Sequence, residues 1–369
     1  MILHLLHYDK GSGGQFARYV IEQFSSPNMS SVFTIMSRPD ESAEFSHPEL
    51  ISYVDPLNHE SVLSLIDSLT KYSSIVLHGA FYPWCETILR RVPDDVKVAW
   101  MFWGGELYDR SNSFLAPITS LMNRLHAFIN NKRVNQGGVS IDAFQRIDYC
   151  LTGVAEEYEF AKQYIRSYRL RHIWYTYYSI EDTVGELIND YCTGCSVWIC
   201  NSASVGNNVF DAVYTLSLPG NRRRIRDRQV IMPLSYGAPW VRNAMLRIGP
   251  KVFGACFHPL LELMPRADYN RLMLDCSTMI MPHYRQAAQG NILTALWLGM
   301  RVYLSEKSVS YTFFKRIGAE IYSFESDFKK YGCERLPKEL VQKNREVLRK
   351  WYGKDHIKQA CNDVVAALR

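Results

Sequence analysis

Short apolar runs alternate with segments of helical periodicity through the first half of the chain. Six apolar runs are typical of buried strands, and four segments between them repeat apolar residues at helical spacing. The predicted strands are residues 2–7, 31–36, 74–78, 96–103, 149–152 and 172–178, and the predicted helices are residues 16–24, 60–69, 84–91 and 156–168. This alternation favours a parallel sheet covered by helices on both faces.

The second half repeats the alternation. Its predicted strands are residues 197–200, 229–232, 276–281 and 301–304, and residues 337–369 are mostly helical. A chain of 369 residues is long enough for two ordinary domains, each with its own core. We therefore predict an α/β protein of two doubly wound, Rossmann-like domains facing each other across a cleft. The predicted boundaries are 1–180, 181–340 and a helical segment 341–369 that can pack back on the first domain.

Composition narrows the class of protein. An apolar content of 47% and a charged content of 21% are those of a folded globular protein. The net charge of +5 suits an anionic small substrate or a membrane surface, and it is too weak to indicate a nucleic-acid partner. No run of 18 apolar residues predicts a membrane span, and the N-terminus lacks the pattern of a signal peptide. The nine cysteines have neither disulfide-framework nor zinc spacing, so we expect reduced thiols and no metal.

One stretch of the second half predicts an anion site. The strand at residues 276–281 ends at Pro282, a polar loop follows, and Gly290-Asn291 opens an apolar helix. Free N–H groups and the helix dipole at such a position favour negative charge, and the guanidinium of Arg285 suits phosphate. The alternative is an ordinary strand–helix turn with a surface arginine.

Two more strand ends of the second half carry polar loops. Asn201, Ser202 and Asn208 follow the strand at residues 197–200, and Ser235 and Tyr236 follow the strand at residues 229–232. Ligands of doubly wound sheets bind at the carboxyl ends of strands. Three neighbouring loops compatible with phosphate or sugar are a stronger signal than any one of them.

In the first half, candidate chemistry also follows strands. Glu106 comes after two glycines at a strand end, where a general base would be placed, and Asp109 is a solvated alternative. His78 ends another strand, a position where histidine is either a packing residue or a functional one. Gly13 and Gly14 end a glycine loop that is either a plain tight turn or an approach for phosphate or sugar. This loop lacks the full dinucleotide fingerprint, so we do not expect a nicotinamide cofactor.

Two segments allow a membrane interpretation. Residues 114–129 have amphipathic helical spacing, with basic residues on or near the flanks at Arg124, Lys132 and Arg133. This helix either packs on its own domain or rests on an anionic bilayer. The arginine-rich run at residues 221–228 is either a solvated loop or a surface that attracts acidic lipid or diphosphate.

The order of these motifs between residues 77 and 304 resembles one enzyme family. The family is the TDP-N-acetylfucosamine:lipid II N-acetylfucosaminyltransferases (4-alpha-L-fucosyltransferases) of bacterial surface-polysaccharide assembly. The motifs that carry the resemblance are His78-Gly79-x-Phe81-x-Pro83, Trp103-Gly104-Gly105-Glu106-Leu107-Tyr108, Asn201-Ser202 with Asn208, Met232-Pro233-Leu234-Ser235-Tyr236, and Arg285-Gln286-x-x-Gln289-Gly290.

The resemblance implies a GT-B fold and a metal-independent hexosyltransferase without a cofactor, because the dTDP-sugar is a substrate. The first domain would bind an undecaprenyl-diphosphate-linked oligosaccharide acceptor, and the second the nucleotide sugar. The protein would be cytoplasmic and peripheral on the inner membrane, and would serve O-antigen or enterobacterial common antigen synthesis.

The resemblance also assigns roles to residues. Glu106 or His78 would accept the acceptor proton if the reaction inverts, and Gly13 and Gly14 would form an acceptor or phosphate loop. The donor contacts would be Asn201, Ser202, Asn208, Ser235, Tyr236, Arg285, Gln286, Gln289, Gly290 and Asn291.

The chain departs from the family pattern at three places. Glu106 stands where the family has Asp, residues 203–206 replace a charged segment, and the second glycine of the Gln-Gly-x-Gly loop is absent. These departures leave the identity of the 6-deoxy sugar open. The alternatives are a nucleotide-sugar epimerase of similar build and a non-catalytic carbohydrate-binding subunit of a membrane assembly complex.

Overall fold

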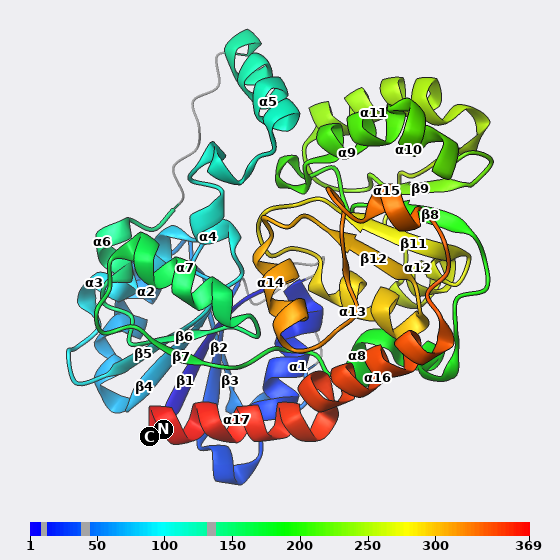
Figure 1. The fold of residues 1–369 in the computed structure, drawn as a ribbon. Helices are drawn as coiled ribbons and strands as arrows, with labels where there is room; N and C mark the ends of the chain where they lie inside the picture. The colour runs from blue at the N-terminus through cyan, green and yellow to red at the C-terminus, as the bar shows by residue number, and fades with distance from the viewer. Residues whose placement is uncertain (9–12, 38–44, 131–137) are drawn as a thin grey trace. The chain divides into compact units, whose positions relative to one another are not determined.

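The structure is a computed structural model that describes residues 1–8, 13–37, 45–130 and 138–369 (Figure 1). The chain forms two compact units. Unit 1 comprises Met1–Arg110, Asn135–Ser179 and Lys354–Arg369, and unit 2 comprises Ser111–Val134 and Ile180–Gly353. No helix of the described residues is long and apolar enough to cross a membrane.

Unit 1 is built on a parallel sheet of seven strands in the order β3-β2-β1-β4-β5-β6-β7. The order reverses between β1 and β4. The strands are β1 (Ile2–His7), β2 (Ser31–Met36), β3 (Ile51–Val54), β4 (Ser74–His78), β5 (Lys97–Met101), β6 (Tyr149–Leu151) and β7 (Arg171–Ile173). The helices of this unit are α1 (Gly13–Phe24), α2 (His59–Asp67), α3 (Pro83–Arg91), α4 (Gly105–Tyr108), α6 (Ile141–Phe144), α7 (Ala155–Ile165) and α17 (Lys354–Leu368).

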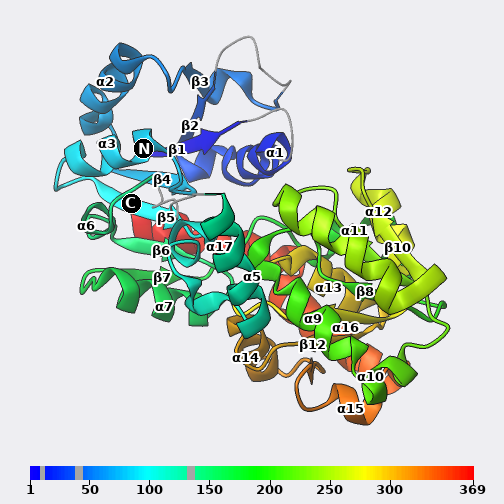
Figure 2. The ribbon, with the colours of Figure 1, turned by 90° about the horizontal axis from the view of Figure 1, so that it is seen from above.

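Helices cover both faces of this sheet. Helices α1 and α17 share one hydrophobic core with strands β1 and β4, while α2, α3, α6 and α7 pack one against the next on the other side (Figure 2). In α1 the core residues are Phe16, Val20, Ile21 and Phe24, which recur at helical spacing. Strand β4 is buried along its whole length, as expected of a strand with helices on both sides.

Unit 2 has a parallel sheet of six strands in the order β10-β9-β8-β11-β12-β13, which reverses between β8 and β11. The strands are β8 (Ser196–Ile199), β9 (Val230–Pro233), β10 (Phe257–Leu260), β11 (Cys276–Met281), β12 (Arg301–Leu304) and β13 (Tyr322–Ser323). The helices are α5 (Pro117–Ile129), α8 (Ile180–Val184), α9 (Val209–Ser217), α10 (Pro219–Arg224), α11 (Pro239–Phe253), α12 (Arg266–Met273), α13 (Gln289–Leu298), α14 (Val309–Arg316), α15 (Phe328–Tyr331) and α16 (Lys338–Tyr352).

Helix α5 belongs to unit 2 although its flanks in sequence belong to unit 1. The carboxylate of Asp211 on α9 accepts hydrogen bonds from the backbone N–H groups of Ile118 (2.9 Å) and Thr119 (2.8 Å). The Oδ1 atom of Asn208 accepts another from Ala116 N (2.9 Å). These acceptors satisfy N–H groups that the first turn of a helix leaves free. Thr119 is buried, and Ile118 packs against the core of unit 2.

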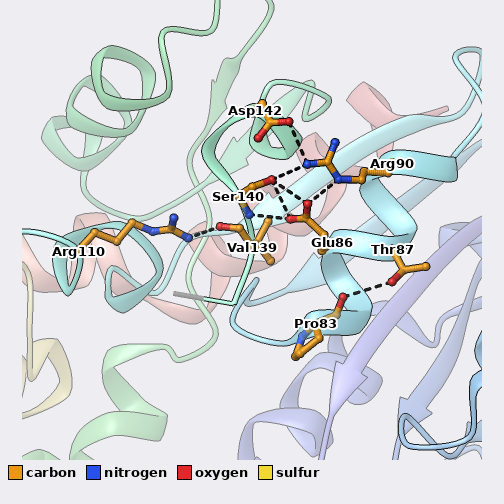
Figure 3. Close-up of polar contacts among 8 residues, drawn as sticks. All are labelled: Pro83, Glu86, Thr87, Arg90, Arg110, Val139, Ser140 and Asp142. Atoms are coloured by element: carbon orange, nitrogen blue, oxygen red, sulfur yellow. Dashed lines mark hydrogen bonds and ion pairs between the residues drawn. The ribbon is translucent and has the colours of Figure 1, made fainter. Parts of the chain in front are cut away.

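Where the chain first leaves unit 1, after Arg110, the segment that returns to this unit lies close by, as Figure 3 shows. The guanidinium of Arg110 donates a hydrogen bond to the carbonyl of Val139. The carboxylate of Glu86 on α3 accepts from Ser140 N (2.6 Å), from Ser140 Oγ (2.7 Å) and from Arg90 Nε (2.5 Å). Burial alone would raise the pKa of Glu86, but these hydrogen bonds from Ser140 and Arg90 lower it. The returning segment is therefore fixed to α3 by a charged group.

The two doubly wound α/β units confirm the predicted fold class, and every predicted strand is present. The last strand of unit 1 is shorter than expected, because β7 ends at Ile173 rather than at residue 178. The sequence missed β3, β10, β13 and the helices α10, α11, α12 and α14. Strand β3 is only half buried, β10 contains Pro259, and β13 has two residues, so none carries the apolar run of a central strand.

The two units also divide the chain differently from the predicted boundaries. Residues 111–134 fall in unit 2 instead of the first domain, because Asn208 and Asp211 bind the start of α5. The segment 341–369 is split at Gly353, with α16 in unit 2 and α17 in unit 1. The apolar residues of α17 complete the core beside α1.

Candidate functional site

The carboxyl ends of β8 and β11 lie side by side in unit 2, at the point where the strand order reverses. In open α/β sheets, ligands bind in the crevice that forms at such a point. The two loops that start there are residues 200–208 and residues 282–288. Most of the donor contacts predicted from the resemblance lie on these two loops or directly after them.

The loop after β8 is held by its own side chains. The Nδ2 atom of Asn207 donates to the carbonyl and to the hydroxyl of Ser202, both at 2.9 Å, and Ser202 Oγ donates to Ser204 Oγ (2.8 Å). Asn208 Nδ2 donates to Pro282 O (3.2 Å), which ties this loop to the loop after β11. Ser202 and Asn208 are both buried, so their hydrogen-bonding groups are used to shape the loops.

The loop after β9 joins the loop after β8 through a short parallel bridge. Ala203 N donates to Tyr236 O (2.8 Å), and a side chain at Gly237, which has a φ of +110°, would collide with the Ala203 backbone. Asn201 Nδ2 donates to the hydroxyl of Tyr236 (2.8 Å), while Asn201 Oδ1 is buried without a hydrogen-bond partner among the described residues. Ser235 is partly exposed beside this pair. We call the place where the strand order of a sheet reverses its switch point. Asn201, Ser235 and Tyr236 therefore gather at one edge of the switch point of unit 2.

Arg285 spans the loops after β11 and β8. Its guanidinium lies against Gly206, where an added Cβ atom would come within 2.8 Å of Arg285 Nε. The missing side chain at Gly206 thus leaves the space that the guanidinium fills. This arrangement places a fixed cation with fork geometry between two loops of the switch point.

His283 lies in the loop after β11 and was not predicted as a site residue from the sequence. It is fully buried, and neither ring nitrogen has a hydrogen-bond partner in the part of the chain that the structure describes. Burial lowers the pKa of His283 to about 4, so the ring is neutral near pH 7.

Helix α13 begins directly after this loop, with Ala288 in a left-handed conformation and no side-chain cap. Its first N–H groups have no acceptor within the helix, and they carry the positive end of the helix dipole. Gln286 Nε2 donates to Gln289 Oε1 (2.7 Å), so these two predicted residues meet. Gly290 is exposed in the first turn. Asn291 Nδ2 donates to the hydroxyl of Tyr269 (2.9 Å), which directs the amide toward α12.

Two tyrosines that hold these amides were missed in the sequence. Tyr352 accepts a hydrogen bond from Gln289 Nε2 (2.5 Å), and Tyr269, which accepts from Asn291, packs edge-on against Trp198. Neither tyrosine follows a strand. Only the tertiary fold brings them to the start of α13, so no local signal could have identified them.

A cavity of about 510 Å³ opens beside the loop after β11 in unit 2. Tyr284 and Lys307 both line this cavity, and Lys307 Nζ lies 5.1 Å from the ring centroid of Tyr284. Arg124 of α5 is the second basic residue of the cavity. The other lining residues are Ser113, Phe114, Leu115, Pro117, Ser120 and Leu121. The cavity therefore combines two cations with hydroxyl and apolar groups.

Glu106 of unit 1 lies at the start of α4, which follows β5. Its Oε1 atom accepts hydrogen bonds from Trp100 Nε1 (3.2 Å) and from the backbone N–H groups of Ala80 and Trp103 (both 3.3 Å). Its Oε2 atom is buried without a hydrogen-bond partner among the described residues. Burial, only partly offset by these hydrogen bonds, raises the pKa of Glu106 to about 7. A carboxyl group with this pKa can take up a proton near neutral pH.

His78, the last residue of β4, belongs to a buried chain of hydrogen bonds. Its Nε2 lies 3.0 Å from His4 Nδ1, and its Nδ1 lies 3.1 Å from the hydroxyl of Tyr177, which also accepts from Trp103 Nε1 (3.0 Å). Burial lowers the pKa of His4 to about 3, and burial followed by the neighbouring His4 lowers the pKa of His78 well below its usual value. Both rings are therefore neutral, and both nitrogens of His78 are occupied.

Gly13 and Gly14 open α1 beside the other switch point, between β1 and β4. Residues 9–12 of their loop lie outside the described residues. Within residues 1–8, 13–37, 45–130 and 138–369, no group of three or more His, Cys, Asp or Glu side chains is arranged to hold a metal ion. The expectation of metal-independent chemistry stays a prediction.

No protein-family model and no curated protein matches the chain. Solved structures do match it over its full length. Sucrose-phosphate synthase from Thermosynechococcus elongatus has a TM-score of 0.63 and 11% identity, covering 100% of this chain and 99% of that chain. The lipopolysaccharide outer core galactosyltransferase WaaB has a TM-score of 0.60 and 10% identity, with 100% and 99% covered. Anabaena HepE, in complex with UDP and glucose, has a TM-score of 0.58 and 11% identity, with 99% of each chain covered.

The chain has the GT-B fold. This finding confirms the fold expected from the resemblance, while membership of the N-acetylfucosaminyltransferase family stays a prediction. In this GT-B chain the two switch points carry different chemistry. Unit 2 offers a cation, amides and a helix N-terminus, and unit 1 offers a buried carboxyl group.

Proposed function

We propose that this GT-B chain is a glycosyltransferase. It moves a 6-deoxy (acetamido) sugar from a dTDP-sugar to an undecaprenyl-diphosphate-linked oligosaccharide on the cytoplasmic face of the bacterial inner membrane. The product would enter O-antigen or enterobacterial common antigen synthesis. Unit 2 binds the nucleotide sugar in this proposal, and unit 1 binds the acceptor.

The placement of Arg285 carries the proposal. Its guanidinium lies against Gly206 of the neighbouring loop, and the uncapped first turn of α13 begins four residues after it. A diphosphate between the two loops would meet the cation on one side and backbone N–H groups on the other. Gln286 lies on the same loop and is hydrogen-bonded to Gln289, and the exposed Gly290 lies in the first turn of α13.

This arrangement suits the bond that breaks. The bond between the anomeric carbon and the diphosphate oxygen is cleaved, and the departing nucleoside diphosphate takes the electron pair. Arg285 and the N–H groups of α13 stabilise the negative charge that develops there. An acceptor hydroxyl oxygen forms the new bond to the anomeric carbon. With inversion its proton passes to Glu106, whose pKa of about 7 suits that role, and with retention no such base is needed.

Similar folds support a nucleotide-sugar donor. HepE was solved with UDP and glucose, and an E. coli protein named for trehalose-6-phosphate was solved with UDP-2-fluoro glucose. The second structure has a TM-score of 0.62 and 8% identity to this chain. The choice of dTDP over UDP rests on the resemblance of the sequence motifs, so the nucleotide is the first property to test.

Thermal shift measurements with dTDP, UDP, GDP and NAD test the donor. We expect dTDP alone to raise the melting temperature of the wild type, and the Arg285→Ala variant to lose most of that shift. Arg247→Ala on the exposed surface of α11 is the matched control and should respond like the wild type. A shift with UDP alone would replace dTDP as the donor and favour another transferase or the epimerase. No shift with any nucleotide would favour the carbohydrate-binding subunit and contradict the proposal.

A transfer assay with a lipid-diphosphate disaccharide or trisaccharide tests the acceptor. Formation of a longer lipid-linked saccharide and release of free dTDP is the expected result. Conversion of the sugar nucleotide without any acceptor would identify an epimerase instead.

A further inference from the structure

Helix α5 exposes a row of large apolar side chains. Leu125, Phe128 and Ile129 are 47%, 84% and 77% exposed, and Leu121 continues the row one turn earlier. Their spacing of three and four residues places them on one face of the helix. Four neighbouring exposed side chains of this size form a patch, which differs from the isolated apolar residues that are ordinary on protein surfaces.

The structure fixes which face of α5 points outward. Asp211 of α9 binds the N–H groups of Ile118 and Thr119, and Thr119 is buried. The ring of His126 stacks on Trp240 of α11 with centroids 4.6 Å apart. The buried Thr119 and the stacked His126 therefore hold a different side of the helix toward the core, and the apolar row stays exposed.

The apolar surface continues along the outer face of α9. Tyr214 and Leu218 follow Asp211 at spacings of three and seven residues, which puts them on the side of α9 that holds α5. They are 55% and 38% exposed. Arg222 of α10 comes four residues after Leu218, and Figures 1 and 2 both place α9 between α5 and α10.

Positive charge flanks this apolar surface. The described residues 111–130 and 212–226 of unit 2 contain five Lys or Arg residues and no Asp or Glu. Arg222, Arg223 and Arg226 are exposed and line a cavity of about 490 Å³, together with Arg228 and the single carboxylate of Asp227. None of these arginines forms an ion pair with another described residue. Arg228 instead donates to Cys195 O (2.7 Å).

We propose that the outward surface of α5, α9 and α10 docks unit 2 on an anionic lipid bilayer. A bilayer offers both partners that this surface lacks, because acidic headgroups attract the arginines and acyl chains take up Phe128, Ile129 and Leu125. A soluble anion would leave the apolar row in water. A neutral apolar partner would leave the arginines uncompensated. This inference rests on the proposed function only in naming the bilayer as the place where a lipid-linked acceptor is met.

Vesicle co-sedimentation of the full chain tests the docking surface. The vesicles are phosphatidylcholine alone or phosphatidylcholine mixed with phosphatidylglycerol. We expect the wild type to bind the mixed vesicles at least about tenfold more tightly than the neutral ones, with the difference reduced by salt. Equal, weak sedimentation with both kinds of vesicle would overturn the proposal.

Two variants separate the apolar and the charged contributions. The triple substitution Leu125→Ser, Phe128→Ser, Ile129→Ser should weaken binding to the mixed vesicles about tenfold or more, because each lost side chain removes buried apolar area. Replacing Arg222, Arg223 and Arg226 by Gln should weaken it by a similar factor and abolish the preference for phosphatidylglycerol. The control for the first variant is Leu57→Ser with Leu263→Ser, both highly exposed, and the control for the second is Lys338→Gln, Lys350→Gln and Lys358→Gln.

Unchanged binding by both patch variants, or equal losses in the controls, would contradict the assignment of the surface. So would patch variants that change self-association of the chain instead of vesicle binding, since that result would indicate a second copy as the occupant. The thermal shift with dTDP and transfer to a water-soluble acceptor saccharide should be unchanged in both patch variants. If the wild type itself showed neither the thermal shift with dTDP nor the transfer, the proposed function would be contradicted, while the vesicle result would still stand.

Discussion

The two switch points of this molecule differ in the burial and the charge of the side chains that they carry. In unit 1 the candidate groups are buried and titratable, and burial moves their pKa values: Glu106 up to about 7 and His4 down to about 3. In unit 2 the candidate groups are partly exposed amides and a guanidinium, with Arg285 set between two loops. The two sheets have the same parallel build and the same kind of reversal in strand order.

The loop residues at the carboxyl ends of the strands therefore give two sheets of the same build different chemical properties. A buried carboxyl group with a raised pKa suits proton transfer, because its protonation changes near neutral pH. A permanent cation beside a helix N-terminus suits a diphosphate, because its charge does not depend on pH over the same range. Substitutions in unit 1 should therefore affect turnover and pH dependence, and substitutions in unit 2 should affect nucleotide binding.

The largest effect is expected for Glu106→Gln. The amide can still accept the hydrogen bonds from Trp100, Ala80 and Trp103, but it cannot take up a proton. We expect turnover to fall by about 10²–10⁴-fold, as for the loss of a general base, while the dTDP affinity stays within about twofold. Steady-state kinetics and titration calorimetry measure the two quantities.

Asp109→Asn is the matched control for Glu106→Gln, because it removes the exposed carboxylate three residues later. This variant should retain turnover close to that of the wild type. Loss of dTDP binding in Glu106→Gln would mean that the carboxyl group only shapes the loops of unit 1.

Arg285→Ala should produce the next largest effect. Removing the guanidinium is expected to lower kcat/KM by about 10²-fold, in line with the loss of one charged transition-state contact, and to weaken dTDP binding. Arg285→Lys should recover only part of the loss, since the ammonium group lacks the fork geometry. Gly206→Val should resemble Arg285→Ala, because a side chain there displaces the guanidinium. An Arg285→Ala variant as active as the wild type would remove the diphosphate assignment.

Acid should destabilise unit 1 through His4. Its folded pKa of about 3 lies below the ordinary value of 6.5, so the unfolded chain binds the proton first and stability is lost as the pH falls below 6.5. At pH 5 this loss is about 2 kcal/mol at most. Denaturant unfolding of the wild type and of His4→Gln at pH 8 and pH 5 measures it, and the variant should lose less stability between the two.

Glu106 should change the stability of unit 1 with pH in the direction opposite to His4, and the same experiment measures this. Its folded pKa is raised from 4.5 to about 7, so the folded state disfavours the charged form and stability is lost as the pH rises from 4.5 to 7. Glu106→Gln should therefore be more stable than the wild type at pH 8, with a smaller difference at pH 5. Equal pH dependence in both variants and the wild type would show that burial does not tune these groups.

A smaller effect is expected for Asn208→Ala in unit 2. Its side chain accepts from Ala116 N and donates to Pro282 O and, at 3.4 Å, to Phe114 O, so the variant loses three hydrogen bonds. We expect a loss of about 1–3 kcal/mol in the free energy of unfolding. Asn221→Ala is a useful comparison, since this buried amide also binds a backbone carbonyl, Thr215 O, but lies outside the switch point. Weakened dTDP binding in Asn208→Ala alone would show that the loop shape matters for the site.

The sequence predicted the central strands of both sheets because they are buried on both faces and form continuous apolar runs. Strands β4 and β11 are fully buried, and both were found. Edge strands such as β3 and β10 are partly exposed and were missed. The position of candidate residues after strands could also be predicted, because parallel strands bring their carboxyl ends to one edge.

Contacts between distant segments could not be predicted. His78 is a candidate for catalysis by its position in the sequence, and the structure joins it to His4 and Tyr177, which are 74 and 99 residues away. The contact between Arg285 and Gly206 joins loops that follow two different strands of the sheet. The start of α5 is held by side chains of α9 about ninety residues later, so its membership of unit 2 has no local signature.

Titration calorimetry with dTDP on the wild type, Glu106→Gln and Arg285→Ala would show whether the nucleotide binds through unit 2 independently of the carboxyl group in unit 1. We expect equal affinity for the wild type and Glu106→Gln, and at least about tenfold weaker binding for Arg285→Ala, because this variant loses a charged hydrogen bond to the diphosphate. Equal dTDP affinity in all three proteins, or a loss confined to Glu106→Gln, would contradict the division of chemistry between the two switch points.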